Sequence, residues 1–253
     1  MTQRRIETSS KPRTRSHPWW RPWSGVLTGF ALAFFAGIAF ATFFGGNGQW
    51  NQGLTWERAL MMRLHTPLPE VVDSTVVALT WFGTNIVLLP IVAVVCWWLW
   101  VYCRRPDAAA RLTVVQLGSY LLNPSLKALY ERQRPMLFER RGWYAWSSYP
   151  SGHAIATVSV LITIALLLHE VRGWRWPYFV FIPIGLASIY SRLYLGVHWP
   201  TDVIAGILVG GVWLGVTIYA FRDRRPESPE ERRKSRRVDV AAADDGGDTL
   251  TIS

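Results

Sequence analysis

Six stretches of the chain are apolar almost throughout, and the polar positions gather between them. Their approximate bounds are Gly25–Phe44, Val76–Val101, Ala109–Leu126, Ala154–His169, Pro177–Ser191 and Val203–Phe221. A helix needs about 20 mostly apolar residues to cross the hydrocarbon core, with a range of roughly 17–25. The first, second and sixth stretches meet this length, and the other three meet it only with flanking residues. We therefore predict an all-α polytopic membrane protein, built as a bundle of six transmembrane helices.

The first stretch has an alternative interpretation as a cleaved signal peptide, because Ala39-Phe40-Ala41 resembles a cleavage site. A signal peptide carries an apolar core of only about 7–15 residues. Here the apolar run is longer, and Phe43 and Phe44 continue it beyond the cleavage-like triplet. The pattern favours an uncleaved membrane anchor.

The segments outside the six stretches divide the chain further. Residues 1–24 form a basic N-terminal segment, residues 25–221 the membrane domain, and residues 222–253 a charged tail. We predict that both end segments are cytoplasmic and that the tail, which is poor in aromatic residues, is disordered. Residues 54–64, "LTWERALMMRL", are typical of a short amphipathic helix on the outer membrane surface.

Glycines recur along the sixth stretch at the spacing of small residues that pack two helices together. They are Gly206, Gly210, Gly211 and Gly215. Such a stripe favours close packing on a neighbouring helix. The same face could serve dimerisation instead, so the oligomeric state stays open.

The distribution of lysine and arginine indicates the orientation. With six spans and a cytoplasmic N-terminus, the inner segments carry nineteen Lys and Arg and the outer loops carry eight. Positive charge is enriched on the cytoplasmic side of membrane proteins. Both termini are therefore predicted inside, in a multi-pass protein of the cell membrane.

Composition changes this picture little. Of 253 residues 50% are hydrophobic, yet the formal net charge is +10. This combination fits a membrane protein with basic aqueous ends better than a soluble nucleic-acid binder, and we expect no nucleic-acid partner. Cys96 and Cys103 are read as free thiols, because the chain has neither a disulfide framework nor a CxxC metal knuckle.

Three stretches, all on the predicted outer side, carry the candidate chemistry. They are "KALYERQRP" (127–135), "PSGH" (150–153) and "SRLYLGVHWPTD" (191–202). The six-helix layout brings these three loops to one face, where a site with its opening on the extracytoplasmic side can form.

Lys127, Arg134 and Arg192 supply three positive charges. The guanidinium group suits bidentate phosphate contacts, and lysine acts as a point charge. Ser151 and Gly152 stand where a helix is expected to begin, so free backbone amides and the positive end of the helix dipole face the loop. Together these groups are suited to hold a phosphate dianion.

Two histidines flank this phosphate position. Asp202 follows His198 by four residues, so its carboxylate can accept a hydrogen bond from one imidazole nitrogen and leave the other free to attack phosphorus. His198 is the candidate nucleophile, which would form a phosphohistidine. His153 is the candidate general acid, which would protonate the leaving oxygen and later activate water.

Each of these residues also has a structural interpretation. Lys127 and Arg134 can be interface residues that reach toward water, His153 a polar helix start, and His198 with Asp202 a loop-to-helix hydrogen bond. All three stretches lie on one predicted face, however, and they hold every ingredient of phosphoryl transfer. This coincidence favours the functional interpretation.

The pattern K-x6-R-P, P-S-G-H and S-R-x5-H-x3-D resembles the signature of the type 2 phosphatidic acid phosphatase superfamily. It is matched at every functional position, and the resemblance extends over about 54–221, including "TWFG" at 80–83. The resemblance implies a six-helix bundle with the site near the outer membrane surface. It also implies that Lys127, Arg134, Ser151, Gly152, His153 and Arg192 surround the phosphate while Asp202 supports attack by His198.

We therefore expect a metal-independent integral-membrane phosphatase without a cofactor, acting on a lipid phosphate in the bilayer. Candidate substrates are phosphatidic acid, phosphatidylglycerophosphate or a polyprenyl diphosphate. A lipid phosphotransferase with the same intermediate is a close rival. A non-catalytic transporter or lipid-binding protein would not need the paired histidines, and a vanadium haloperoxidase would be soluble. Arg140 and Arg141 are candidates for a second phosphate or are solvated loop charges, so the head group stays open.

Overall fold

The computed structural model of the protein describes residues 21–46, 48–65, 68–138 and 147–222. Within these ranges the regular structure is entirely helical, which confirms the all-α class. The longer helices are α1 (Arg21–Gly45), α4 (Asn85–Val101), α5 (Pro106–Tyr130), α8 (Trp176–Tyr194) and α9 (Pro200–Phe221). A further helical segment consists of α6 (Gly152–Ala156), a π-helical turn (Thr157–Leu161) and α7 (Ile162–Arg172). The short elements are α2 (Thr55–Leu64), α3 (Glu70–Leu79) and two 3₁₀ turns, Trp50–Gln52 and Thr80–Gly83.

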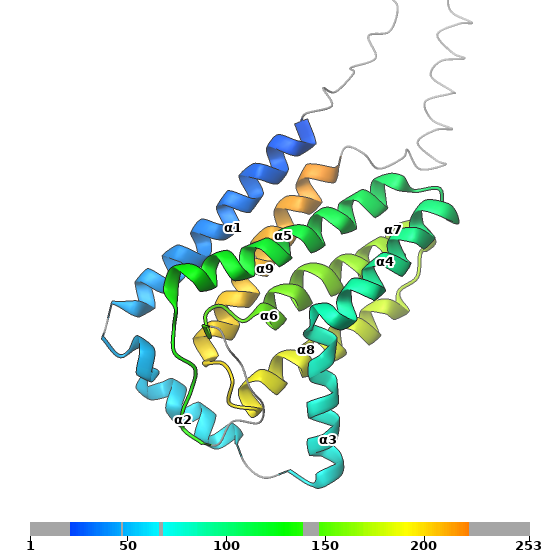
Figure 1. The fold of residues 1–253 in the computed structure, drawn as a ribbon. Helices are drawn as coiled ribbons and strands as arrows, with labels where there is room; N and C mark the ends of the chain where they lie inside the picture. The colour runs from blue at the N-terminus through cyan, green and yellow to red at the C-terminus, as the bar shows by residue number, and fades with distance from the viewer. Residues whose placement is uncertain (1–20, 47, 66–67, 139–146, 223–253) are drawn as a thin grey trace, which may run out of the picture.

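The long helices lie side by side in one bundle (Figure 1). Helix α1 begins and α9 ends at the same end of the bundle, and the two helices pack along each other. Helices α2 and α3, the described parts of the connection from α5 to α6, and the connection from α8 to α9 lie at the opposite end. The fold thus brings the three candidate stretches to one end, as the six-helix layout predicts.

Three helical segments of the described chain are long and apolar enough to cross a membrane: Trp23–Gly45, Gly152–Arg172 and Pro200–Phe221. The bent pair Glu70–Gly83 and Asn85–Val101 makes a fourth if it is one span. Helices α5 and α8, with 25 and 19 residues, do not reach that hydropathy. Helix α5 includes Asp107, Arg111 and Lys127, which lower its hydropathy. The count of six spans stays a prediction.

The second expected span, 76–101, is not one continuous helix. Its first part belongs to α3 and to the 3₁₀ turn Thr80–Gly83, and the axis bends by 56° before α4. Thr84 is the break, because its backbone is extended (φ −91°, ψ 148°) and its hydroxyl donates to the carbonyl of Trp81 at 2.7 Å. The hydropathy of the sequence does not indicate this bend, because the threonine and glycine at the break are uncharged and leave the stretch apolar overall.

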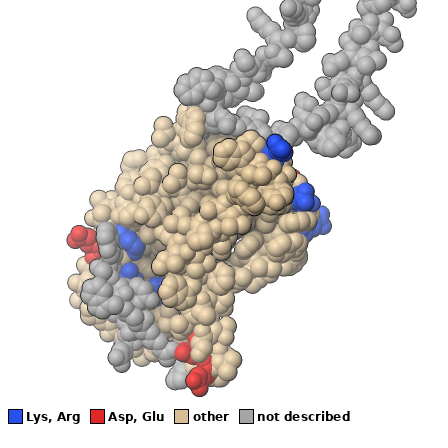
Figure 2. Space-filling model, turned by 45° about the vertical axis from the view of Figure 1, so that its right-hand side comes forward, with Lys and Arg blue, Asp and Glu red and all other residues tan. Residues whose placement is uncertain are grey.

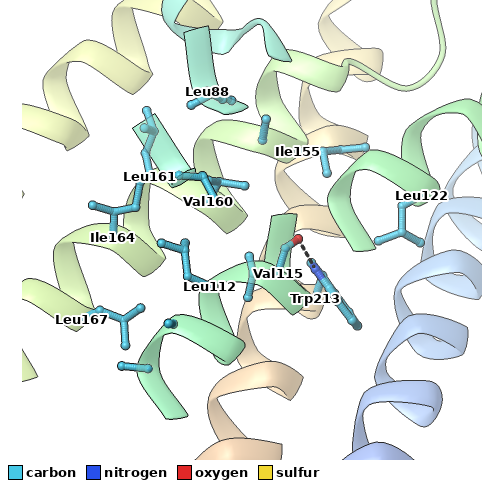
Figure 3. Close-up of a cluster of buried hydrophobic side chains, with 14 of the residues drawn as sticks. Leu88, Leu112, Val115, Leu122, Ile155, Val160, Leu161, Ile164, Leu167 and Trp213 are labelled. Atoms are coloured by element: carbon cyan, nitrogen blue, oxygen red, sulfur yellow. Dashed lines mark hydrogen bonds between the residues drawn. The ribbon is translucent and has the colours of Figure 1, made fainter. Parts of the chain in front are cut away.

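A continuous apolar core fills the bundle between α4, α5, the Gly152–Arg172 segment and α9 (Figure 3). Leu88, Leu112, Val160 and Ile164 are fully buried there. Trp213 crosses from α9 to α5, where its Nε1 donates to the carbonyl of Val115 at 3.0 Å. An indole N–H in an apolar environment needs such a partner, so this bond fixes the approach of the two helices.

The glycine stripe of α9 serves two different faces. A Cβ at Gly206 would lie 2.6 Å from the carbonyl oxygen of Ser151, and one at Gly210 would lie 2.8 Å from that of Ile155. The close packing on a neighbouring helix predicted for these two is confirmed, and the neighbour is α6. A Cβ at Gly211 or Gly215 would meet nothing within 4 Å.

Charged residues lie unevenly on the face of the molecule that Figure 2 shows. On the face that Figure 2 shows, lysine and arginine gather near both ends, and a broad band between them carries neither sign of charge. At the lower end some of these cations lie within a hollow of the surface (Figure 2). This distribution agrees with a membrane location.

The expected amphipathic helix is confirmed as α2, and one of its faces, with Glu57 and Met61, is buried. The basic segment 1–24 lies almost wholly outside the described residues. The tail 223–253, Arg140 and Arg141 lie outside them as well.

Candidate active site

The three candidate stretches meet through backbone contacts. Arg134 Nη1 donates to the carbonyl of Val197 at 2.6 Å, which joins the first stretch to the third. The backbone N–H of Ser151 donates to the carbonyl of Asp202 at 2.9 Å, which joins the second to the third. All eight residues singled out in the sequence are described, and these contacts place the stretches that carry them around one region.

The histidine of the third stretch lies just before α9 begins. His198 is 3% exposed, and its Nδ1 lies 3.6 Å from Oδ2 of Asp202. That separation is longer than a hydrogen bond, although the two groups face each other at the i,i+4 spacing. The same Oδ2 accepts the backbone N–H of Trp199 at 2.8 Å, a contact that fixes the carboxylate at the start of α9. The carboxylate therefore stands ready to orient the imidazole.

Burial lowers the pKa of His198 well below its ordinary value. The positive charges of Arg134, Lys127 and Arg192 act in the same direction, because each opposes a second cation nearby. A hydrogen bond with the backbone of Ser148 opposes the shift but does not reverse it. The imidazole is therefore neutral near pH 7, which is the form that can act as a nucleophile.

Arg132, which sequence reasoning passed over, holds the other side of Asp202. Its Nη1 donates to Oδ1 of Asp202 at 2.6 Å, and its Nη2 donates to Oε2 of Glu57 at 2.9 Å. Its Nε donates to the carbonyl of Trp50 at 2.9 Å, and its guanidinium lies 3.7 Å from the centre of the Trp50 indole. Arg132, Glu57 and Asp202 are each 0% exposed. One buried guanidinium thus bridges two buried carboxylates.

Glu57, which was not singled out from the sequence either, connects this network to helix α2. Its Oε1 accepts the backbone N–H of Thr201 at 3.0 Å and the hydroxyl of Thr201 at 2.5 Å. Its Oε2 accepts the N–H of Leu54 at 2.8 Å. In the sequence Glu57 is one of several charges on an amphipathic helix, and nothing there distinguishes it. Arg132 had a weak signal, a third cation within "KALYERQRP".

Two of the three predicted phosphate-binding cations converge on one backbone position. Lys127, 8% exposed at the end of α5, donates from Nζ to the carbonyl of Ser147 at 2.5 Å. Arg134 Nη2 donates to the same carbonyl at 3.4 Å. Burial and the neighbouring charge of Arg134 lower the pKa of Lys127 to about 7. An anion bound between the two groups would favour the charged form of Lys127, so the arrangement is suited to an anion.

Arg192 is 2% exposed at the end of α8. Its Nη1 donates to the hydroxyl of Thr80 at 3.4 Å, and that hydroxyl also forms a short hydrogen bond with Ser191. The "TWFG" turn is therefore part of the site. Gly83 of this turn packs on His153, because a Cβ there would lie 2.4 Å from Cδ2 of the imidazole.

Buried polar atoms of three predicted site residues have no hydrogen-bond partner within the part of the chain that the structure describes. They are Oγ of Ser151, Nε2 of His153 and Nδ1 of His198. Buried polar atoms are nearly always paired in native proteins, and exceptions indicate a ligand or a catalytic role. The residues come from the second and third stretches, the region where the phosphate is expected.

A metal-binding arrangement is not found among the described residues, since no three His, Cys, Asp or Glu side chains are grouped to hold an ion. Besides Asp202, the buried acid beside the site is Glu57, and both are already engaged by Arg132 and by backbone N–H groups.

Comparisons with known proteins agree with this geometry. The sequence model of the PAP2 superfamily matches residues 108–226, which include all three stretches. Phosphatidylglycerophosphatase B of Bacillus subtilis is 31% identical over 143 residues, which are 54% of this chain and 70% of that protein. The chain belongs to the PAP2 superfamily.

Two other similar proteins are named as undecaprenyl-diphosphatases. An undecaprenyl-diphosphatase of Sulfolobus acidocaldarius is 29% identical over 147 residues, covering 56% of this chain and 66% of that protein. A putative undecaprenyl-diphosphatase of Escherichia coli is 30% identical over 130 residues, covering 49% and 62%. The chain thus matches slightly less than two thirds of the length of these two relatives.

A solved structure has the same fold. The crystal structure of a transmembrane PAP2-type phosphatidylglycerolphosphate phosphatase from Bacillus subtilis matches with a TM-score of 0.64 and 24% identity. The match covers 82% of this chain and 98% of that one. The PAP2 fold therefore extends well beyond the motif region, and it includes most of the helices described above.

Proposed function

We propose that this PAP2 protein is an integral-membrane lipid phosphatase that works through a phosphohistidine. The observation that carries the proposal is the buried His198 facing Asp202, with Lys127, Arg134 and Arg192 close enough to lower the pKa of its imidazole. A nucleophile with an orienting carboxylate and a cluster of cations is the arrangement that phosphoryl transfer requires. The names of its relatives support a phosphate or diphosphate ester of a lipid as the substrate.

The first half-reaction transfers the phosphoryl group to the enzyme. In the reactive tautomer the proton of His198 lies on Nδ1, which faces Asp202. The other nitrogen gives up its hydrogen bond with the backbone of Ser148 and attacks phosphorus, and the bond from phosphorus to the lipid oxygen breaks. Binding of the phosphate dianion favours the protonated form of His153, which gives its proton to the leaving oxygen. The three cations and the amides of Ser151 and Gly152 hold the phosphoryl oxygens, where negative charge gathers in the transition state.

The second half-reaction restores the enzyme. His153, now neutral, takes a proton from water as that water attacks the phosphorus of phosphohistidine. The nitrogen–phosphorus bond breaks, inorganic phosphate leaves, and both histidines return to their starting forms. Asp202 stabilises the positive charge that His198 carries while it is phosphorylated.

We also propose that the protein crosses the membrane six times, with both termini in the cytoplasm and the site on the outer side. The excess of Lys and Arg in the inner segments supports this orientation. A Ser147→Cys variant should react with a membrane-impermeant thiol reagent in intact cells, because residue 147 lies at the site end. Labelling that requires permeabilised cells would reverse the orientation.

The enzymatic proposal is tested by trapping the intermediate. Purified protein in detergent is given phosphatidic acid with radioactive phosphate and quenched in alkali, in which phosphohistidine survives. The wild type should retain label that acid removes, and His198→Ala should retain none and release no phosphate. His153→Ala should keep partial activity toward nitrophenyl phosphate, whose leaving group needs no proton. Equal loss in both variants would contradict the division of roles.

The same assay separates hydrolysis from phosphotransfer. With glycerol present, a phosphatase releases inorganic phosphate as its main product, whereas a phosphotransferase forms glycerol phosphate. A non-catalytic lipid-binding protein would release phosphate from no substrate.

A further inference from the structure

A cavity of about 240 Å³ lies between α4, α5 and α6, on the bundle side of His153. Its polar lining includes Thr84, just before α4, Asn85 from α4, Ser119 and Asn123 from α5, and His153 from α6. Tyr120, whose side chain is 53% exposed, also lines it. The cavity therefore shares His153 with the phosphate site and extends toward the exposed face of α5.

The position of this cavity relative to the phosphate follows from α5. Ser119, Asn123 and Lys127 are spaced by four residues, so they lie on one face of the helix. With a rise of 1.5 Å per residue, Asn123 lies about 6 Å and Ser119 about 12 Å along the helix from Lys127. A phosphate held at Lys127 would thus have the cavity one to two helical turns beneath it, in the direction of the bilayer interior.

Polar groups in this cavity lack partners. Oδ1 of Asn123 and Nε2 of His153 are buried without a hydrogen bond among the described residues. Pro124 has no N–H to donate to the carbonyl of Tyr120. Asn85 accepts a hydrogen bond from Gln116 at 3.3 Å, which ties the inner end of the cavity together. At membrane depth such groups are costly unless something pairs with them, so the cavity is suited to a ligand with its own hydrogen-bonding groups.

The cavity is polar but uncharged, since its lining contains no Lys, Arg, Asp or Glu. A second phosphate placed there would have no Lys or Arg beside it and only His153, whose proton the reaction transfers to the leaving oxygen, to offset its buried charge, which is unfavourable. A polyprenyl chain carries no oxygen beyond its phosphates and would leave the amides unpaired. A glycerolipid phosphate has ester or hydroxyl oxygens a few bonds from its phosphate, at the depth of Asn123 and Ser119.

We propose that this cavity is the subsite for the glycerol part of the substrate, so that the enzyme selects glycerolipid phosphates over polyprenyl diphosphates. The inference rests on the proposed phosphatase function and names its substrate class. His153 fits this placement, because a general acid must reach the leaving oxygen, and in a glycerolipid phosphate that oxygen belongs to the glycerol. The glycerol part of the leaving diacylglycerol would thus lie in the cavity.

The test compares substrates that share a phosphate but differ beneath it: dioctanoyl phosphatidic acid, farnesyl phosphate, farnesyl diphosphate and nitrophenyl phosphate. Wild-type kcat/KM should be highest for phosphatidic acid. In Ser119→Val and in Asn85→Leu, the ratio of kcat/KM for phosphatidic acid to that for farnesyl phosphate should fall about tenfold, as expected when a hydrogen bond is lost. Ser119→Ala is a third cavity variant, which removes the hydroxyl without adding volume. It serves in place of the first two if their larger side chains hinder folding.

Ser125→Val is the matched control. Ser125 lies on the exposed side of α5, and its hydroxyl donates to the carbonyl of Leu121. This variant should keep the wild-type ratio. An unchanged ratio in all three cavity variants, an equal loss on every substrate, or a wild-type preference for farnesyl diphosphate would overturn the subsite while leaving a phosphatase. Failure of the wild type on every lipid would overturn the phosphatase proposal as well.

Discussion

Arg132 Nη1 lies 2.6 Å from Oδ1 of Asp202, while the other oxygen of that carboxylate faces His198. The carboxylate thus has one side fixed by a buried guanidinium and the other directed at the proposed nucleophile. Arg132 is fixed in turn by Glu57, with 2.9 Å between Nη2 and Oε2. Helix α2 is therefore connected to Asp202 through two charged contacts, and Asp202 in turn faces His198.

We predict that Glu57→Gln lowers kcat more than it changes KM. Glutamine keeps the shape but removes the charge that orients Arg132, so Asp202 would hold His198 less firmly. A hydrogen bond between charged groups contributes about 1.5–3 kcal/mol, and a loss of this size would also lower the Tm. Steady-state kinetics with phosphatidic acid and thermal unfolding in detergent measure both effects.

Glu70→Gln is the control, because Glu70 is an exposed acid in the first turn of α3. It should match the wild type in both measurements. A fall in Tm for Glu57→Gln with wild-type kcat would show that the network only stabilises the fold and does not position His198.

Gly83→Ala should reduce activity by at least about tenfold. The added Cβ would lie 2.4 Å from Cδ2 of His153 and 2.6 Å from Oγ of Ser188, so the imidazole must move. A displacement of about 1 Å in a catalytic group can cost two orders of magnitude in rate. Turnover of phosphatidic acid at saturation, compared with that of Gly211→Ala, measures the effect.

Gly211 is a suitable control because a Cβ there meets nothing within 4 Å. In the interior of a helix, alanine in place of glycine stabilises by roughly 0.5–1 kcal/mol. Gly211→Ala should therefore keep full activity. A wild-type kcat in Gly83→Ala would contradict this prediction, because it would mean that the imidazole of His153 accommodates the added Cβ without leaving its active position.

The sequence was sufficient for the helical class and for the meeting of the three motif stretches at one end of the bundle, whereas the roles of the eight motif residues stay predictions. Side chains such as His198 and Asp202 can be found in the sequence, because their spacing of four residues by itself predicts that the two groups face each other. Glu57 lacks such a signal and that of Arg132 is weak, since their importance depends on a contact across 75 positions. The bend before α4 was missed because it depends on backbone geometry at Thr84, which hydropathy does not report.

The protein should lose stability in acid partly through His198. Burial lowers the pKa of this imidazole in the folded state, whereas the unfolded chain takes up a proton near the ordinary pKa of about 6.5. Below that pH the unfolded state binds more protons than the folded state, so falling pH favours unfolding, and above it the effect vanishes.

Thermal unfolding between pH 5 and 7.5 tests this linkage. The Tm of the wild type should fall more steeply below about pH 6.5 than that of His198→Asn, which has no titrating group at this position. Parallel curves would indicate that His198 is protonated equally in both states, and the burial argument would then be wrong.

The enzyme should turn over in excess EDTA with little loss. A phosphatase that depends on magnesium needs carboxylates to hold the ion, and Glu57 and Asp202 are both engaged by Arg132. Lys127, Arg134 and Arg192, together with the amides at the start of α6, supply the positive charge that a metal would provide. Vanadate, which can adopt the five-coordinate geometry of phosphoryl transfer at His198, should inhibit competitively with phosphatidic acid. Loss of activity on chelation that magnesium restores would show that these three cations do not neutralise the phosphate.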